Sequence, residues 1–289
     1  MPRGGPIDAA KLIPAALSVS AGPRPVRELL VEIIVNQGWY SSLDAEDKAD
    51  AWLPRFKSRM RHDITTIRDE GGFLSFQFNS SGDDYVQGSC FCEPHDPLEV
   101  QQAKIRRAYT LQVHNCCLGL TPNQFEQLSG KLLSLLNVEH AYVSRRSADQ
   151  GIDFFGRVPI GKMLKPTLLD MGAEKHMFVW IIGQSKHYPL TKVSTGEIRE
   201  LVGSVELARA KVFAGANDPL EDLTVRLCDP IFYMFFTSGT FTRDSKELMT
   251  RSGVLAFEGL QLAQFIADHG IGTVEGAFCQ SAFHEWLAR

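Results

Sequence analysis

Two polar residues close a strongly apolar segment, FVWIIGQSKHY, at residues 178–188. Gln184 and Lys186 are two residues apart, so on a β-strand their side chains lie on the same face. An amide oxygen can bind a hard cation, and a lysine ammonium can hold a water or offset negative charge on a phosphate. The pair alone is a weak signal, because the same spacing recurs at Gln102 and Lys104 in a segment with helical character.

Two acidic residues earlier in the chain complete a site around this pair. Asp153 in the segment DQGIDFFG follows a turn and begins another apolar strand, and Glu126 lies on a helix that precedes it. We predict a metal-dependent phosphodiesterase site in which Asp153, Gln184 and Glu126 are the ligands of a hard divalent cation. Lys186 then positions the attacking water. The alternative roles are structural, with Asp153 as an ordinary turn acid and Glu126 as a favourable charge near a helix N-terminus.

The second half of the chain has the pattern of an α/β domain. Two of its helices begin with capping boxes, Thr121 with Gln124 and Ser194 with Glu197. Short apolar runs between turns predict the strands. The order of helix, three strands, helix, strand, helix, strand and helix describes a mixed sheet flanked by helices. The predicted helices are 121–136, 194–210, 242–251 and one from 260, and the predicted strands are 139–146, 152–160, 177–186, 230–239 and 254–258.

The first half is predicted to be mainly helical, with positive charge on its last helix. We expect a helix in RPVRELLVEIIVNQG, a short one in LDAEDKADAW and a third that starts at Pro54 and ends before Gly71. Two short β-segments around the turn NSSGDD follow, and helices followed by a β-hairpin are typical of a winged helix. The third helix carries Arg55, Lys57, Arg59, Arg61 and Arg68. These residues predict contact with DNA phosphates or guanines, the alternative being a solvated basic face in a packing or dimerisation domain.

The bulk composition excludes several classes of protein. The 289 residues carry a formal charge of −4 and 22% charged residues, which suits one large or two ordinary soluble domains. No apolar run approaches the roughly 20 residues of a membrane span. The segment KLIPAALSVSAG is a poor signal peptide because Pro14 interrupts it. We therefore expect a cytoplasmic protein without membrane contact.

The six cysteines do not have the spacing of a disulfide framework, and they indicate a reducing compartment. Small buried thiols are the simplest interpretation. A zinc site is the alternative, although the two-residue spacing of a zinc knuckle is absent. Its ligands would be Cys90, Cys92, His114 and either Cys116 or Cys117.

The motifs, in this order, resemble the catalytic domain of Mrr-type restriction endonucleases, within the PD-(D/E)xK nuclease superfamily. The resemblance covers roughly residues 118–268, from FEQLSGKLL through IDFFGRV and FVWIIGQSKHY to FFTSGTFTRD. That family replaces the usual acid before x-Lys by glutamine. The resemblance implies the same four site residues as the spacing does. It also implies that TSGTFT, residues 237–242, is the turn after the fourth core strand, where hydroxyls and amides can contact phosphate or cap a helix.

The N-terminal half is similar, more loosely, to the winged-helix domain that precedes this nuclease domain, which favours DNA contact by the basic helix. We predict a winged-helix DNA-binding domain over residues 1–88, a partly helical linker over 89–117 and an endonuclease domain over 118–289, with Pro94 and Pro97 marking the boundary after the first domain. The linker and the tail after about residue 270 match no part of the family.

The resemblance implies a Mg2+-dependent endonuclease that hydrolyses DNA phosphodiester bonds, in restriction of foreign or modified DNA, including methylated DNA. The predicted partner is double-stranded DNA, and cutting both strands with one site per chain predicts a homodimer or a larger assembly. Two alternatives stay open, because a fold does not determine function. One is a catalytically silent DNA-binding protein on a nuclease fold, and the other is a repair or junction nuclease on the same core.

Overall fold

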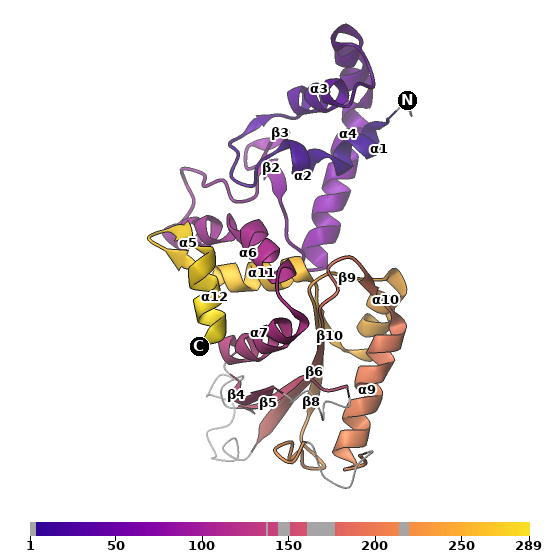
Figure 1. Ribbon diagram of the computed structural model, residues 1–289. Helices are drawn as coiled ribbons and strands as arrows, with labels where there is room; N and C mark the ends of the chain where they lie inside the picture. The colour runs from indigo at the N-terminus through magenta and orange to yellow at the C-terminus, as the bar shows by residue number, and fades with distance from the viewer. Residues whose placement is uncertain (1–3, 137, 144–150, 161–176, 214–219) are drawn as a thin grey trace. The chain divides into compact units, whose positions relative to one another are not determined.

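The computed structural model describes residues 4–136, 138–143, 151–160, 177–213 and 220–289. The chain forms two compact units, one of residues 1–110 with 267–270 and the other of residues 111–266 with 271–289. A separate cluster of buried apolar side chains lies in each unit. The first unit holds the N-terminal helices and the hairpin, and the second holds the predicted α/β sheet (Figure 1).

The first unit combines helices with a small antiparallel sheet in which β3 lies between β1 and β2. Helices followed by a hairpin agree with the expected order of elements, and the winged-helix assignment itself stays a prediction. The elements are α1 (Pro6–Lys11), α2 (Ile13–Ala16), β1 (Arg24–Pro25), α3 (Val26–Asn36), α4 (Ser42–Asp69), β2 (Phe76–Asn79), β3 (Gly82–Gly88) and α5 (Leu98–Arg107).

Helix α4 corrects one prediction, because the two helices expected on either side of Pro54 are one continuous helix of 28 residues. A proline inside a helix costs roughly 3 kcal/mol, since it removes a backbone donor and crowds the preceding turn. The apolar stripe of α4 continues past the proline at helical spacing, and packing of this stripe offsets that cost. Its buried members are Ala45, Ala49, Phe56, Met60 and Ile64.

The second unit is built around a five-stranded mixed sheet of order β10-β8-β6-β5-β4. Strands β10, β8 and β6 are parallel, whereas β5 is antiparallel to both of its neighbours. The remaining elements of the chain are α6 (Thr110–Leu118), α7 (Pro122–Leu135), β4 (Glu139–Val143), β5 (Phe154–Pro159), β6 (Phe178–Lys186), β7 (Lys192–Val193), α9 (Thr195–Arg209), β8 (Ile231–Thr237), β9 (Thr240–Phe241), α10 (Arg243–Ser252), β10 (Leu255–Phe257), α11 (Gly259–Asp268), β11 (Thr273–Val274), β12 (Ala277–Phe278) and α12 (Gln280–Ala288).

Helices cover both faces of this sheet (Figure 1). Helix α7 packs against β4, β5 and β6, and α9 packs against β6 and β8 on the other face. Both capping boxes are present, at the starts of α7 and α9. The prediction of a mixed sheet flanked by helices is therefore confirmed.

The turn expected at residues 147–151 and the end of the strand before it lie mostly outside the described residues.

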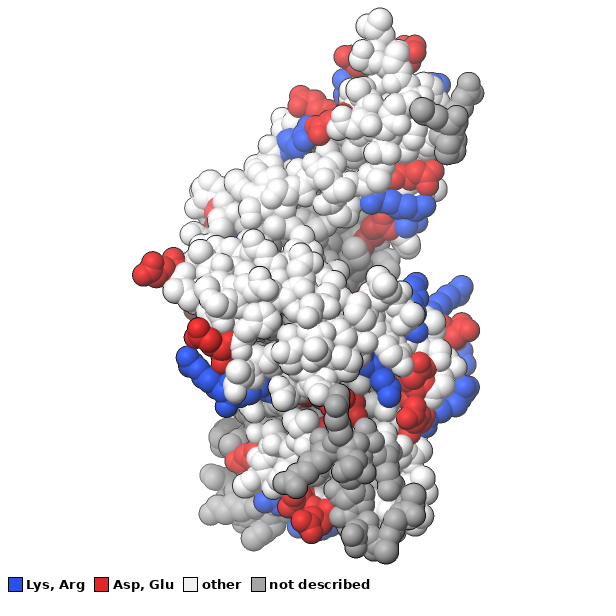
Figure 2. All heavy atoms as spheres, in the orientation of Figure 1, with Lys and Arg blue, Asp and Glu red and all other residues white. Residues whose placement is uncertain are grey.

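Acidic and basic side chains are interspersed on the face of the molecule shown in Figure 2. This mixture agrees with the small net charge of the chain. Among the described helices, none has the length and apolar character needed to cross a membrane.

Gly183 gives a test of how tightly the sheet is packed. A Cβ atom at this position would lie 2.3 Å from the carbonyl oxygen of Met234 and 2.3 Å from the ring of Phe154. Gly183→Ala is therefore expected to lower the free energy of unfolding by about 1–3 kcal/mol through overpacking, measured by urea unfolding of the full chain.

Gly203 is the matched control. It lies inside α9, and a Cβ atom there would have no neighbour within 4 Å. Gly203→Ala should raise stability by about 0.5–1 kcal/mol, because alanine is the better helix former. An equal effect of the two substitutions would contradict the packing around Gly183.

Candidate active site

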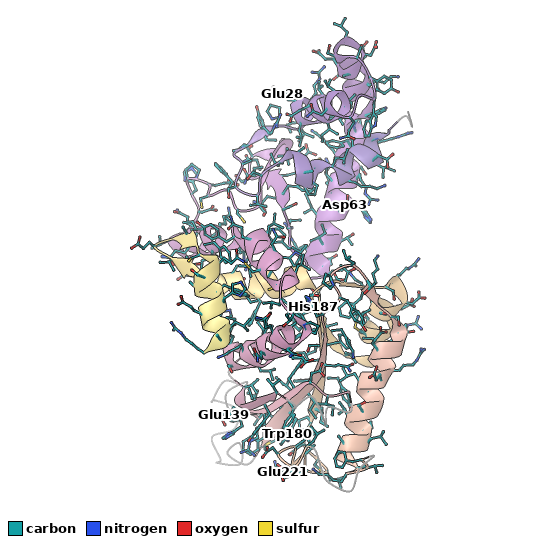
Figure 3. The ribbon with its side chains drawn as sticks, viewed as in Figure 1. Glu28, Asp63, Glu139, Trp180, His187 and Glu221 are labelled. Carbon is teal, nitrogen blue, oxygen red and sulfur yellow. The ribbon has the colours of Figure 1, made fainter. Side chains whose placement is uncertain are left out.

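Gln184 and Lys186, two of the residues predicted to do chemistry, lie at the carboxyl end of β6, the central strand of the sheet. This strand is buried from Val179 to Ser185. Figure 3 shows Trp180 near the beginning of the strand and His187 just beyond its other end. The last side chains of β6 therefore lie where this central strand leaves the apolar core, at its carboxyl end.

Gln184 is a buried amide with an unusual environment. Its side chain is only 1% exposed, and its Oε1 atom has no hydrogen-bond partner among the described residues. A buried polar group without a partner costs roughly 1–3 kcal/mol. Such an atom is a ready ligand for a cation or for a hydrogen-bond donor that the substrate brings.

Asp153 immediately precedes β5 and is tied to the same end of β6. Its backbone N–H donates to the carbonyl oxygen of Gly183 at 3.0 Å. Its carboxylate Oδ2 accepts from the backbone N–H of Ser185 at 2.6 Å and from the Ser185 hydroxyl at 3.1 Å. The structure therefore fixes this carboxylate beside the residue that separates Gln184 from Lys186.

Lys186 ends β6 and is half-buried. Its carbonyl oxygen accepts from the Thr237 hydroxyl at 3.1 Å and from the Ser238 backbone N–H at 3.3 Å, which anchors its backbone to the end of β8. Its ammonium therefore projects from a fixed backbone position on the same face as Gln184.

Glu197 of α9 is a neighbour of Lys186 that the sequence did not assign to the site. Burial alone would raise the pKa of its carboxyl group, but hydrogen bonds from Ser194 and the charge of Lys186 hold that pKa below its usual value. In the sequence its one signal was the capping box with Ser194, which explains its place on the helix and not its closeness to β6.

Glu126 lies near the start of α7 and is half-buried. The residue before it, Phe125, packs against the ring of His187 with 5.4 Å between ring centres. This contact brings the beginning of α7 next to the end of β6. Burial also lowers the pKa of His187, and its Nδ1 atom has no partner among the described residues.

The predicted DNA-binding residues on α4, in the first unit, do not form one uniform basic face. Lys57 makes ion pairs with Asp83 and Asp84 of the β2–β3 hairpin, and Arg61 pairs with Asp83. The Lys57 side chain is only 14% exposed.

The other three predicted DNA-binding residues of α4 differ from these two. Arg59 binds Asp63, one turn further along the helix, at 2.9 Å. Arg55 and Arg68 are exposed and have no ion pair among the described residues. The opposing charges on the hairpin were visible in the sequence as NSSGDD, but their pairing with α4 needed the tertiary structure.

The predicted zinc alternative is not formed in the described part of the chain. No three His, Cys, Asp or Glu side chains there are grouped so as to hold a metal ion. All six cysteines are free thiols, and burial raises the pKa of Cys117 to about 12. The predicted set of Asp153, Gln184 and Glu126 differs from such a group, because an amide supplies its third oxygen.

The unpaired amide of Gln184 leads to a stability test. Gln184→Met keeps the volume of the side chain and removes the unpaired oxygen, so it should raise the free energy of unfolding by about 1–2 kcal/mol without divalent ions. Urea unfolding measures the change.

Gln87 is the matched control, because it is a buried amide whose groups are paired with Asn79 and Glu93. Gln87→Met should lower stability by about 1–3 kcal/mol, since both partners lose a hydrogen bond. A loss of stability in Gln184→Met similar to that in Gln87→Met would mean that the Gln184 amide is paired.

Comparison with solved structures finds similarity to restriction enzymes. The structure titled "MspJI Restriction Endonuclease in Complex with 27-mer Oligonucleotide" has 17% identity and a TM-score of 0.40, with 69% of this chain and 40% of that chain covered. The "DNA modification-dependent restriction endonuclease AspBHI" has 16% identity and a TM-score of 0.40, with coverages of 73% and 46%. The DNA-bound structure of FokI has 9% identity and a TM-score of 0.36, with coverages of 91% and 44%. The chain thus spans less than half the length of each of these proteins.

A comparison with curated proteins finds no match. A family model described as "Mrr_cat: Restriction endonuclease" matches residues 117–214. All four predicted catalytic residues, Glu126, Asp153, Gln184 and Lys186, lie within this segment. The similarity to the Mrr-type restriction endonuclease family therefore lies in the second unit of the chain.

Proposed function

We propose that the protein is a divalent-metal-dependent DNA endonuclease that hydrolyses phosphodiester bonds. The observation that carries this proposal is the buried and unpaired amide oxygen of Gln184, next to the anchored carboxylate of Asp153 and the ammonium of Lys186. A structural role does not explain an unpaired oxygen, whereas a ligand that arrives with the substrate does.

The donor set fits Mg2+ or Mn2+. Asp153 and Gln184 would hold the ion, with Glu126 as a further ligand, because hard cations prefer carboxylate and amide oxygens. A bound ion of this kind polarises a phosphate oxygen and makes a coordinated water more acidic. The Ser185 backbone N–H and hydroxyl keep Asp153 in one orientation, so that its carboxylate does not need to be ordered when the substrate binds.

Lys186 supplies positive charge where the attacked phosphate becomes more negative. Its ammonium can hold the attacking water or donate to a phosphate oxygen, and its half-buried position strengthens this interaction relative to bulk water. Glu197 offsets the charge of Lys186 in the absence of DNA.

The natural substrate is proposed to be double-stranded foreign or modified DNA, including methylated DNA, which a homodimer or larger assembly would cut on both strands. The first unit would engage DNA as a winged helix through α4. Because Asp83 and Asp84 already pair with Lys57 and Arg61, DNA phosphates must compete with these two carboxylates for the cations. The cytoplasm is the proposed compartment.

Substitution of the site residues tests the proposed chemistry. Purified wild-type protein with Mg2+ or Mn2+ should nick or cut plasmid DNA, and Asp153→Asn and Lys186→Met should each reduce the rate by about 100-fold or more. A panel of unmethylated, 5-methylcytosine and N6-methyladenine DNA identifies the preferred substrate.

Lys104→Met is the control, because Lys104 belongs to the second Gln-x-Lys of the chain and pairs with Asp96 in the first unit. It should leave the cutting rate within about threefold of wild type. If Asp153→Asn or Lys186→Met cuts as fast as wild type, the site assignment is wrong. Gel retardation in EDTA, with no cutting of any DNA by any divalent ion, would favour the silent DNA-binding protein.

The ion pairs between α4 and the hairpin predict an effect on DNA affinity. The double variant Asp83→Asn with Asp84→Asn should bind DNA about tenfold more tightly at low salt. The slope of log affinity against log salt concentration should become steeper by the amount expected for about two more phosphate contacts. Fluorescence anisotropy over a range of salt concentrations measures both.

A double variant with the same change of net charge separates local from general effects. Asp47→Asn with Glu99→Gln neutralises two exposed acids of the same unit that make no ion pair among the described residues. It should change affinity by less than about threefold. Equal effects of the two double variants would contradict competition at Lys57 and Arg61.

A further inference from the structure

A pocket of about 200 Å³ lies in the second unit, just beyond the carboxyl ends of the parallel strands β6 and β8. In open α/β sheets, ligands bind preferentially at this end of the strands. The pocket lies between the segment after β6, the turn after β8, and the helices α6 and α11. Residues that define it are His114, Leu118, Leu190, Lys192, Ser238 and Leu260.

Ser238 lines this pocket and carries a buried hydroxyl group without a partner among the described residues. Its side chain is 0% exposed, and its Oγ atom has no hydrogen-bond partner among the described residues. A fully buried hydroxyl without a partner is uncommon, because it costs free energy that a packed apolar side chain would not. A ligand with hydrogen-bonding groups in the pocket would satisfy it.

Closely packed backbone forms one wall of the pocket. A Cβ atom on Gly239 would lie 2.2 Å from the carbonyl oxygen of Tyr188, and one on Gly259 would lie 2.1 Å from that of Ser238. The wall is connected to the candidate active site, because the Ser238 backbone N–H donates to the carbonyl oxygen of Lys186 at 3.3 Å. The pocket therefore has a fixed position relative to Lys186.

The lining favours a flat, largely apolar group over a phosphate. Its walls include Leu118, Leu190 and Leu260. His114 also lines it, with its Nε2 atom 3.4 Å from the carbonyl oxygen of Ser238, and burial lowers the pKa of this imidazole. Glu258 adds a carboxylate, which binds Lys246 at 3.1 Å and the Phe241 backbone N–H at 3.0 Å and would repel a phosphate.

Size and charge at the rim narrow the choice of ligand. Sites for drug-sized ligands have volumes of roughly 300–1,000 Å³, so a pocket of about 200 Å³ suits a single heterocyclic base. Lys192 is exposed in β7, opposite Thr240 of β9, and can neutralise a phosphate outside the pocket. Apolar walls, a few hydrogen-bonding groups and a cation at the rim match the parts of one nucleotide.

We propose that this pocket receives one unstacked nucleobase of the DNA strand close to the scissile phosphodiester. Ser238 and His114 hydrogen-bond its edge, and Lys192 contacts an adjacent phosphate. The inference rests on the proposed endonuclease function, and it adds that a base leaves the stack at the catalytic domain when DNA binds.

Fluorescence of 2-aminopurine tests this directly, since the base becomes bright when it leaves the stack. Duplexes with 2-aminopurine at successive positions are titrated with the 289-residue chain in Ca2+. Among the described residues, none of those that line the pocket is a Trp, Tyr or Phe that would quench the base. We expect the 2-aminopurine fluorescence to rise several-fold at one position of the duplex.

Ser238→Ala should raise the protein concentration that gives half of this fluorescence change about fivefold, because one hydrogen bond to the base is lost. The free energy of unfolding of this variant should be unchanged or slightly higher.

Two variants of α6 form a matched pair. Leu118→Phe fills the pocket and should abolish the rise and slow cutting about tenfold. Leu111→Phe, at a residue of the same helix that is 44% exposed, should behave as wild type. An abasic site at the responsive position should restore cutting by Leu118→Phe to within about threefold of wild type, because no base then needs to enter.

The outcomes separate the pocket from the proposed hydrolysis. A rise that depends on Leu118 and Ser238 in a protein that never cuts DNA supports the pocket and overturns the nuclease. Cutting without a rise at any position, or a Leu118→Phe variant that equals Leu111→Phe, overturns the pocket and leaves the nuclease intact. Absence of both DNA binding and cutting overturns both.

Discussion

Pairing on both edges of β6 is the constraint on which the second unit depends. β5 runs antiparallel to this strand on one side and β8 runs parallel to it on the other, so its backbone donors and acceptors are satisfied within the sheet. The strand can therefore be buried from Val179 to Ser185 between α7 and α9. Because the backbone is satisfied, the polar side chains at its end are the groups that remain available for ligands. Gln184 illustrates this, as its amide oxygen is unpaired at the end of an otherwise apolar strand.

The same end of the sheet combines firm anchoring with unsatisfied groups. The Asp153 carboxylate is fixed by Ser185, and the Lys186 backbone is fixed by Thr237 and Ser238. In contrast, polar atoms of Gln184, His187 and Ser238 have no partner among the described residues. Rigid support around unpaired polar atoms is typical of functional sites, where some stability is lost so that binding can recover it.

Much of the fold could be predicted because local signals and tertiary structure agree. The capping boxes at Thr121 and Ser194 begin α7 and α9, and the order of helices and strands follows from the periodicity of apolar residues. The break expected at Pro54 was wrong, because the local effect of a proline was overcome by burial of residues on both sides of it. The spacing of Gln184 and Lys186 was visible in the sequence, whereas the contact of Asp153 with Ser185 depends on how β5 pairs with β6.

Contacts between charged residues that are far apart in the sequence could not be predicted, for a different reason. The pairing of Lys57 with Asp83 joins residues 26 positions apart, and the approach of Glu197 to Lys186 depends on how α9 packs on the sheet. Periodicity describes which face a residue occupies, but it does not specify which residue of another element lies opposite. The sequence thus showed that α4 carries basic side chains. It did not show that two of them, Lys57 and Arg61, form ion pairs with Asp83 and Asp84.

The parallel pairing of β6 with β8 also has a consequence for the order in which the molecule is made. Lys186 is held by the hydroxyl of Thr237, which lies 51 residues further along the chain. A ribosome that has just completed β6 has therefore not yet made the strand that fixes this lysine, and closing so long a loop is slow compared with forming a helix. The end of the sheet that carries the candidate site can become ordered only after β8 has left the ribosome. A nascent chain thus lacks this assembled arrangement until most of the second unit has been synthesised.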